Sequence, residues 1–132
     1  MKVSVLVPAY NGEKYLAECL ESILSQDFGD FELLVSDDKS TDGPPDIIDR
    51  YARQDSRISW WRNAENLGAV NNFRLCLQKA HGDFVKFMCG DDKLLTSSAI
   101  GKMSALLSKE NSVSLVSSSS LVIDSESNVV AT

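Results

Sequence analysis

Short apolar runs alternate along this sequence with segments whose apolar residues recur at helical spacing. The first run, Val3–Val7, is rich in valine, which is typical of a parallel strand covered on both faces. Apolar residues then recur every three or four positions from Leu16 to Leu24, and Phe31–Ser36 forms the next run. A strand, a helix and a strand in this order form a β-α-β unit with a right-handed crossover. The repeated alternation predicts an α/β fold built on a doubly wound, mostly parallel sheet.

The same alternation continues through most of the remaining chain. We expect the first strand to end at Pro8, because proline cannot donate to a sheet ladder. A short helix should begin at Pro44 or Pro45, since proline is tolerated in a first helical turn. The further expected elements are a strand at Ile58–Trp61, a helix with Val70, Phe73, Leu77 and Ala80 inward, a buried strand at Phe84–Met88, a helix capped by Thr96 or Ser97 with Ile100, Met103, Leu106 and Leu107 inward, and strands at Val113–Val116 and Leu121–Ile123.

The segment Asp83–Asp92, with the sequence DFVKFMCGDD, places two adjacent carboxylates directly after a predicted strand. Asp91 and Asp92 should therefore lie at the rim where open α/β sheets bind their ligands. Neighbouring carboxylates repel each other, and a bound divalent cation would relieve that repulsion. Mg²⁺ and Mn²⁺ favour such oxygen ligands and commonly bridge to phosphates. The alternative is a solvated turn, because Asp and Gly are also ordinary turn residues.

Polar residues also gather in the loops after the other predicted strands. Because the carboxyl ends of parallel strands share one edge of a sheet, these loops should meet around one site. An unrelated α/β scaffold with acidic turns is the alternative, since turns favour Asp and Asn in any case. The residues concerned are Tyr10 and Asn11, Asp37 and Asp38, and Asn66 and Gly68.

Length and composition exclude several other classes of protein. A chain of 132 residues corresponds to one domain, and 43% hydrophobic with 24% charged residues is ordinary for a globular protein. The net charge of −6 argues against a nucleic-acid partner, which requires a basic surface. No apolar run reaches the length of a membrane span, and the N-terminus has no signal-peptide pattern. Three scattered cysteines, Cys19, Cys76 and Cys89, are most simply reduced, which indicates a cytoplasmic location.

Four segments resemble the family 2 glycosyltransferases in order and spacing: VSVLVPAYNGEKYLAECLESILSQ, FELLVSDDKSTDG, NAENLGAVNNF and HGDFVKFMCGDD. This resemblance covers residues 2–107 and implies a GT-A fold that binds a nucleoside diphosphate sugar together with Mn²⁺ or Mg²⁺. It implies a nucleotide-sugar site of Pro8, Ala9, Tyr10, Asn11, Asp37, Asp38, Asn66, Gly68 and Asp91, with Asp38 at the base and with Asp91 and Asp92 as metal ligands.

Two positions depart from the family pattern. Cys89 stands where a common form of the last motif has its first acid, which leaves the ribose contact of that acid open. Many relatives also carry an Arg-Asn pair in the helix after the third strand. Here the corresponding segment reads Asn71-Asn72-Phe73-Arg74, and it leaves open which of these residues meets the phosphates.

The resemblance also implies what the chain does and with which partners. Residues 1–132 are expected to be one donor-binding domain that uses a UDP-sugar, with a saccharide or lipid-linked acceptor from polysaccharide, lipopolysaccharide or glycoconjugate synthesis. The catalytic base would lie beyond Thr132, because Asp124 and Glu126 fall in a predicted strand and turn. Exposed apolar surface would favour a homodimer, and the full-length enzyme would act in the cytoplasm at the inner face of the membrane. The alternatives are a non-catalytic nucleotide-sugar-binding module and a metal-dependent phosphotransfer domain.

Overall fold

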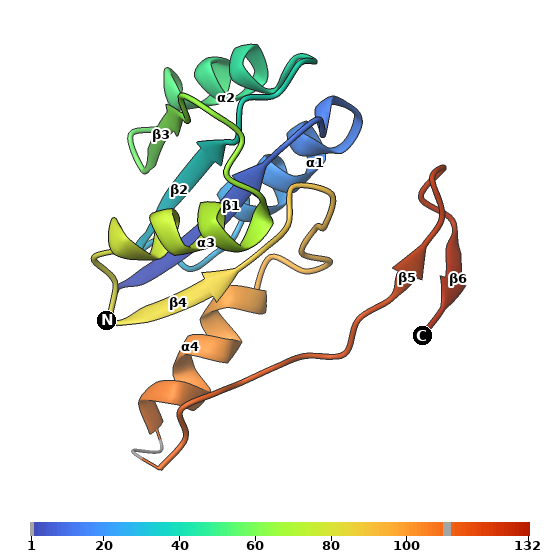
Figure 1. Cartoon of the computed structure of the whole chain (residues 1–132). Coiled ribbons are helices and arrows are strands. Elements are labelled where there is room, and N and C mark those ends of the chain that lie inside the picture. The colour runs from blue at the N-terminus through green and yellow to red at the C-terminus, as the bar shows by residue number, and fades with distance from the viewer. Residues whose placement is uncertain (1, 110–111) are drawn as a thin grey trace. The chain divides into compact units, whose positions relative to one another are not determined.

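The computed structural model describes residues 2–109 and 112–132 and divides into two compact units, Met1–Gly101 and Lys102–Thr132. Helices and strands alternate along the first unit as the sequence predicts (Figure 1). In chain order the elements are β1 (Val3–Ala9), α1 (Glu13–Leu24), β2 (Phe31–Asp37), α2 (Pro44–Ala52), β3 (Ile58–Arg62), α3 (Ala69–Gln78), β4 (Phe84–Phe87), α4 (Ala99–Lys109), β5 (Val122–Ile123) and β6 (Val129–Ala131).

The first four strands form one parallel sheet in the order β3-β2-β1-β4. The chain builds outward from β1 through β2 to β3, and then returns to the other side of β1 to add β4. Such a reversal is the topological switch point of a doubly wound sheet. The predicted fold class is therefore confirmed.

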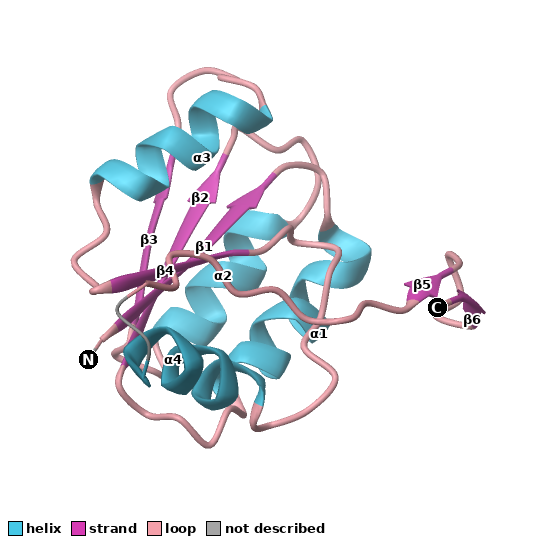
Figure 2. Cartoon of the chain, turned by 90° about the horizontal axis from the view of Figure 1, so that it is seen from below, coloured by secondary structure: helices cyan, strands magenta, loops and turns pink. Residues whose placement is uncertain are grey.

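Helices cover both faces of this sheet, with α3 on one side and α1 and α2 on the other (Figure 2). Successive side chains of a strand point to opposite faces, so β1 supplies both layers of the core. Val5 and Val7 pack with Leu20 of α1, whereas Leu6 packs with Cys76 of α3. Each of these five side chains is fully buried, and burying one valine or leucine is worth about 1.5–3 kcal/mol.

Strand β1 does not end at Pro8 as predicted, but continues to Ala9. Its ladder with β4 is shorter and stops at the pair Leu6 and Phe87, where the Met88 nitrogen donates to the Leu6 oxygen. Alternate residues of a parallel strand turn their backbone groups to the same neighbour, so the proline nitrogen faces the β4 side. Because β4 no longer pairs at that point, the missing N–H interrupts no ladder bond.

Strand β4 is less buried than the sequence predicts. It ends at Phe87, which is 50% exposed, although the following residue Met88 is buried. Within the described residues β4 pairs only with β1 and therefore forms one edge of the sheet. The prediction of a buried strand over Phe84–Met88 is wrong for this reason.

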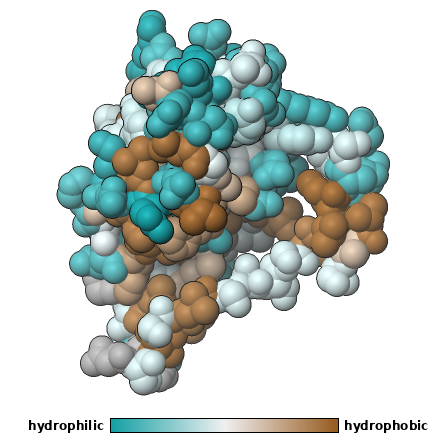
Figure 3. Space-filling view, in the orientation of Figure 1, coloured by the Kyte–Doolittle hydropathy of each residue, from teal (hydrophilic) through white to brown (hydrophobic). Residues whose placement is uncertain are grey.

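Two predicted helical stripes also differ from the observed buried faces. On α3, Val70 and Leu77 are 74% and 46% exposed, while Asn72 and Cys76 are buried. Apolar side chains consequently gather on the surface over α3 in Figure 3. On α4, Leu106 is 54% exposed and not inward as predicted. The hydrogen bonds of Asn72 determine which face α3 buries.

The second unit contains the antiparallel pair β5 and β6. Asp124 organises the turn between them, because its carboxylate accepts hydrogen bonds from the backbone nitrogens of Glu126 and Asn128 at 2.9 Å each. The predicted strand at Val113–Val116 is wrong, since these residues form no ladder with any described part of the chain. None of the described helices combines the length and the hydropathy that crossing a membrane requires.

Candidate functional site

The loops after the four parallel strands enclose a cavity of about 510 Å³ at the carboxyl edge of the sheet. It lies where β1 and β4 diverge, at the switch point where open α/β sheets bind ligands. Its volume is in the range of small-molecule and cofactor sites. The lining residues are Pro8–Gly12, Tyr15, Leu16, Asp38, Asn66, Gly68, Ala69, Asn72, Phe73 and Cys89–Asp91.

Asp38, directly after β2, is a buried carboxylate that holds the loop after β3. Its Oδ1 accepts hydrogen bonds from Asn63 Nδ2 and the Leu67 nitrogen at 2.8 Å each, and its Oδ2 accepts one from the Gly68 nitrogen at 2.9 Å. Asp38 is only 2% exposed, so its charge depends on these three neutral donors. Gly68 has a φ of 79°, which favours glycine at the point where this loop enters α3.

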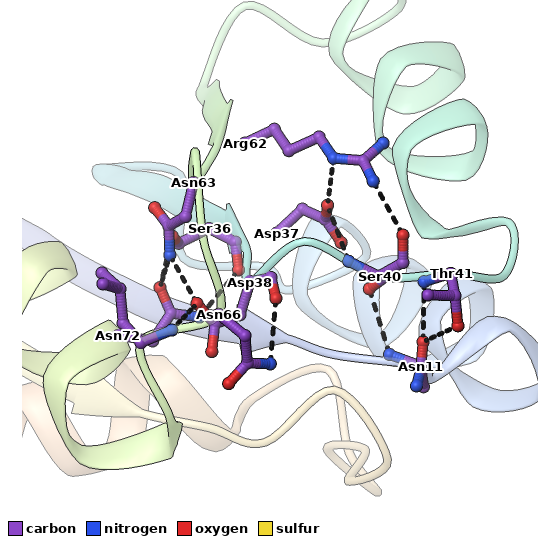
Figure 4. Close-up of polar contacts among 11 residues, drawn as sticks. Asn11, Ser36, Asp37, Asp38, Ser40, Thr41, Arg62, Asn63, Asn66 and Asn72 are labelled. Atoms are coloured by element: carbon purple, nitrogen blue, oxygen red, sulfur yellow. Dashed lines mark hydrogen bonds and ion pairs between the residues drawn. The ribbon is translucent and has the colours of Figure 1, made fainter.

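Asn63 links Asp38 to α3 through a buried polar network (Figure 4). Its Nδ2 donates to Asn72 Oδ1 at 2.9 Å as well as to Asp38. Asn72 in turn donates to the Ser36 backbone oxygen at 3.0 Å and accepts from the Ser36 hydroxyl. An unpaired buried amide is costly, so these bonds determine which face of α3 turns inward. Asn72 thereby occupies a position that the apolar pattern assigned to the outside.

Asp37, the neighbour of Asp38, has a different environment. It is fully buried, lies outside the cavity lining, and its Oδ2 is 3.3 Å from Arg62 Nε. The same Oδ2 accepts from the Ser40 nitrogen, and Arg62 also donates to the Ser40 oxygen at 2.8 Å (Figure 4). Asp37 therefore joins β3 to the loop after β2 and is not among the residues that line the cavity.

Asn11 fixes the loop after β1 against the loop after β2. Its backbone has a φ of 50°, a left-handed conformation that asparagine tolerates better than most residues. Its side-chain oxygen accepts hydrogen bonds from the backbone nitrogen and the hydroxyl of Thr41, at 2.9 and 3.2 Å. The backbone nitrogen of Asn11 donates to the Ser40 hydroxyl at 3.0 Å. The cavity wall formed by this loop is therefore held by contacts within the chain.

The rim after β4 carries three potential metal ligands. Cys89, Asp91 and Asp92 are all exposed, and one ligand atom of each lies within 4.8 Å of the others. Carboxylate oxygens suit Mg²⁺ and Mn²⁺, whereas a thiolate favours softer ions. This donor set fits a divalent cation, with Asp91 and Asp92 supplying the hard ligands that the sequence predicts.

The other two cysteines are inert residues of the core. Burial raises the pKa of Cys19 to about 12, and the charges of Asp92 and Asp91 add to this effect. Burial likewise raises the pKa of Cys76 to about 11. The Cys19 thiol donates to the Cys89 backbone oxygen at 3.4 Å and so supports the rim as a neutral group.

All the predicted nucleotide-site residues except Asp37 line the cavity, and Asp92 lies beside it in the rim cluster. The network of Ser36, Asn63 and Asn72 was not predicted from the sequence. Two signals could have indicated it: Ser36 is a polar residue directly after the apolar run Leu33–Val35 of β2, and Asn63 directly follows β3. Tyr15 and Phe73, which add aromatic surface to the cavity, carried no separate signal.

Residues 4–128 match the model of a protein family described as Glycosyl transferase family 2. Over 111 residues the chain is 37% identical to the GalNAc(5)-diNAcBac-PP-undecaprenol beta-1,3-glucosyltransferase of Campylobacter jejuni. That similarity covers 83% of this chain and 35% of the relative.

Two solved structures resemble the chain in both fold and sequence. A crystal structure of Staphylococcus aureus TarS in complex with UDP-GlcNAc has a TM-score of 0.78 and 33% identity, covering 84% of this chain and 32% of that one. The mannosyltransferase PcManGT from Pyrobaculum calidifontis, in complex with GDP-Man and Mn²⁺, has a TM-score of 0.75 and 27% identity, covering 80% and 32%. The chain thus spans about a third of the length of these proteins.

Proposed function

Because the chain belongs to the family 2 glycosyltransferases, we propose that it is the donor-binding domain of an enzyme that transfers a sugar from a nucleoside diphosphate sugar to an acceptor hydroxyl. The observation that carries this proposal is a single cavity lined by both the buried acid Asp38 and the exposed acid Asp91. The UDP-GlcNAc bound to TarS and the GDP-Man bound to PcManGT support a nucleotide sugar as the ligand.

The residues around the cavity suit the parts of such a donor. Tyr10 is 54% exposed and Phe73 half-buried, so both can offer apolar ring surface to a base or sugar. Asp38 offers a carboxylate oxygen to the N–H or O–H groups of the nucleoside. Asp91, in contrast, carries a negative charge that would repel the diphosphate, so the two can lie close together only when a cation compensates this repulsion.

We assign that compensation to a divalent cation, Mn²⁺ or Mg²⁺, held by Asp91 and Asp92. When bound, such an ion supplies Lewis-acid stabilisation of the negative charge that develops on the leaving diphosphate. The two carboxylates orient the donor at the rim, and the hydrogen bond from the Cys19 thiol to the Cys89 backbone oxygen supports the loop that carries them. The Mn²⁺ bound to PcManGT is consistent with this assignment.

The acceptor we propose is a saccharide or lipid-linked saccharide of cell-envelope synthesis, and the enzyme would act on it at the membrane surface. The name of the Campylobacter relative, which acts on an undecaprenol-linked glycan, supports this class. Asp124 is not proposed as the catalytic base, because its carboxylate is engaged in the turn between β5 and β6.

Calorimetric titration with UDP, in the presence and absence of Mn²⁺, tests the donor and metal assignments together. We expect binding that Mn²⁺ strengthens in the wild type, and loss of that strengthening in Asp91→Ala. Glu126→Ala, which removes an exposed acid from the second unit, is the matched control and should behave like the wild type. Equal Mn²⁺ enhancement in Asp91→Ala would refute the metal site, and failure of any nucleoside diphosphate to bind would refute the proposed function.

A further inference from the structure

The turn after β4 brings a thiol and two carboxylates together within four residues. The Asp92 nitrogen donates to the Cys89 oxygen at 3.1 Å and closes this turn. The Cys19 thiol of α1 donates to the same oxygen at 3.4 Å and ties the turn to the core. The backbone of the turn is thus held by bonds that do not use the side chains of Cys89, Asp91 and Asp92.

These three side chains are also available to a ligand. Cys89, Asp91 and Asp92 are exposed, and within residues 2–109 and 112–132 none of them has a side-chain hydrogen bond or ion pair. Lys93 follows them directly, but its Nζ lies 3.0 Å from the Glu18 carboxylate. The charges of the two neighbouring carboxylates are therefore not compensated by Lys93, and they favour the binding of a cation.

The spacing of the donor atoms allows one ion to contact all three residues. One donor atom of each lies within 4.8 Å of the other two. Bonds from a divalent ion to sulfur or to carboxylate oxygen are about 2.0–2.4 Å long, so two ligands of one ion lie at most about 4.8 Å apart. The Cys89 sulfur is therefore within reach of an ion that Asp91 and Asp92 bind.

A sulfur ligand changes which ion such a site prefers. Carboxylate oxygens alone suit Mg²⁺ and Mn²⁺, whereas the thiolate of a cysteine selects softer ions such as Zn²⁺. Three protein ligands with an open fourth position are the usual arrangement of a catalytic zinc ion. The open position at this rim would be available to a diphosphate oxygen of the proposed donor.

We propose that Cys89 is a third ligand of the divalent ion, and that it gives the site a preference for an ion of the zinc class over Mn²⁺ and Mg²⁺. Mn²⁺ and Mg²⁺ bind through Asp91 and Asp92 without drawing on the sulfur. The inference rests on the metal assignment of the proposed function and extends it to the identity of the ion. PcManGT, in comparison, is bound to Mn²⁺.

Titration of the chain with Co²⁺, a coloured substitute for Zn²⁺, tests whether the sulfur binds the ion. A cobalt–thiolate bond gives a charge-transfer band in the near ultraviolet, which carboxylate ligands do not give. The wild-type chain should develop this band, and Cys89→Ala should lack it. Cys76→Ala is the matched control, because it removes a buried thiol that lies outside the donor cluster, and it should keep the band.

Calorimetric titrations with Zn²⁺ and Mn²⁺ measure the ion preference. Loss of an outer-shell partner alone typically lowers metal affinity about 10- to 100-fold, so loss of a ligand should cost at least about tenfold. Cys89→Ala should therefore weaken Zn²⁺ binding by about tenfold or more and leave Mn²⁺ binding nearly unchanged. Cys89→Asp, which supplies a carboxylate in place of the sulfur, should lack the cobalt band and strengthen Mn²⁺ binding relative to Zn²⁺. Because Cys89 is exposed, both variants should melt like the wild type.

The outcomes separate the role of Cys89 from the proposed function. Wild-type chain that binds Co²⁺ without a charge-transfer band, or a ratio of Zn²⁺ to Mn²⁺ affinity that Cys89→Ala leaves unchanged, would overturn the inference. Donor binding would still stand in that case if Mn²⁺ strengthens the binding of UDP. A chain that shows the cobalt band but binds no nucleoside diphosphate would support Cys89 as a ligand and refute the proposed function. Absence of binding by all these ions would overturn the inference together with the metal assignment.

Discussion

Replacing Asp38 by asparagine should destabilise the protein although the side chain keeps its size and shape. An amide has one acceptor oxygen and one donor nitrogen, whereas the buried carboxylate accepts bonds on both oxygens. If the amide oxygen takes the place of Oδ1, it keeps the bonds from Asn63 and Leu67, but its NH₂ group then faces the Gly68 N–H. The opposite orientation sets the NH₂ group against two donors and is worse.

The magnitude follows from the better of the two orientations. One hydrogen bond to a charged group is lost, which is worth about 1.5–3 kcal/mol, and the Gly68 N–H keeps only its longer bond to Asn66 Oδ1 at 3.2 Å. We therefore expect the free energy of unfolding to fall by about 2–3 kcal/mol. For a chain of this size each 1 kcal/mol shifts the melting temperature by roughly 3–6 °C, so the shift should be on the order of 10 °C.

Thermal unfolding followed by circular dichroism measures this shift. Asp91→Asn makes the same chemical change at an exposed carboxylate and should stay within about 0.5 kcal/mol of the wild type. An Asp38→Asn protein that melts together with Asp91→Asn would show that Asp38 does not hold the loop after β3.

Three further predictions concern the scaffold. Gly82→Ala should destabilise the fold strongly, because the new Cβ would lie 2.6 Å from the Ser4 backbone nitrogen. Chemical denaturation measures the free energy of unfolding, and a value close to that of the wild type would contradict this prediction. Cys19, whose pKa burial raises to about 12, should resist iodoacetamide at pH 8 until urea unfolds the chain, as mass spectrometry of the labelled protein can check. Burial alone would raise the pKa of Glu32, but hydrogen bonds from Ser4 and the His81 backbone lower it below 4.5 overall. Its ionised form therefore adds stability above about pH 4.5 that is lost as the pH falls through the lowered pKa, and Glu32→Gln should flatten this part of a stability–pH curve measured by urea unfolding.

The strands and helices of the first unit could be predicted because their periodicity reflects two-sided burial. The run Val3–Val7 carries apolar residues on both faces since helices cover both faces of β1, and the acids of the rim follow directly from where β4 ends. Periodicity failed where hydrogen bonding and not hydropathy decides burial. Asn72 is buried by its bonds to Ser36 and Asn63, and this turns Val70 to the solvent.

Two other features lay outside what local sequence could indicate. Asp37 and Asp38 are chemically identical neighbours, and only the position of Arg62 on β3 and of the Leu67–Gly68 backbone decides which one lines the cavity. A strand also needs a partner, so the apolar composition of Val113–Val116 predicted a ladder that no described residue completes.

Pro8 has a consequence for the shape of the sheet itself. Met88 donates to the Leu6 oxygen, and in a parallel ladder its own oxygen would next accept from the nitrogen of residue 8. Proline has no hydrogen to give, so pairing between β1 and β4 cannot advance by another rung, although on its other side β1 still pairs with β2 as far as Ala9. The two strands are free to separate at the position where the cavity opens, and Pro8 is part of its wall. Pro8 thus limits how far the pairing between β1 and β4 can extend, and it does so through its missing backbone N–H.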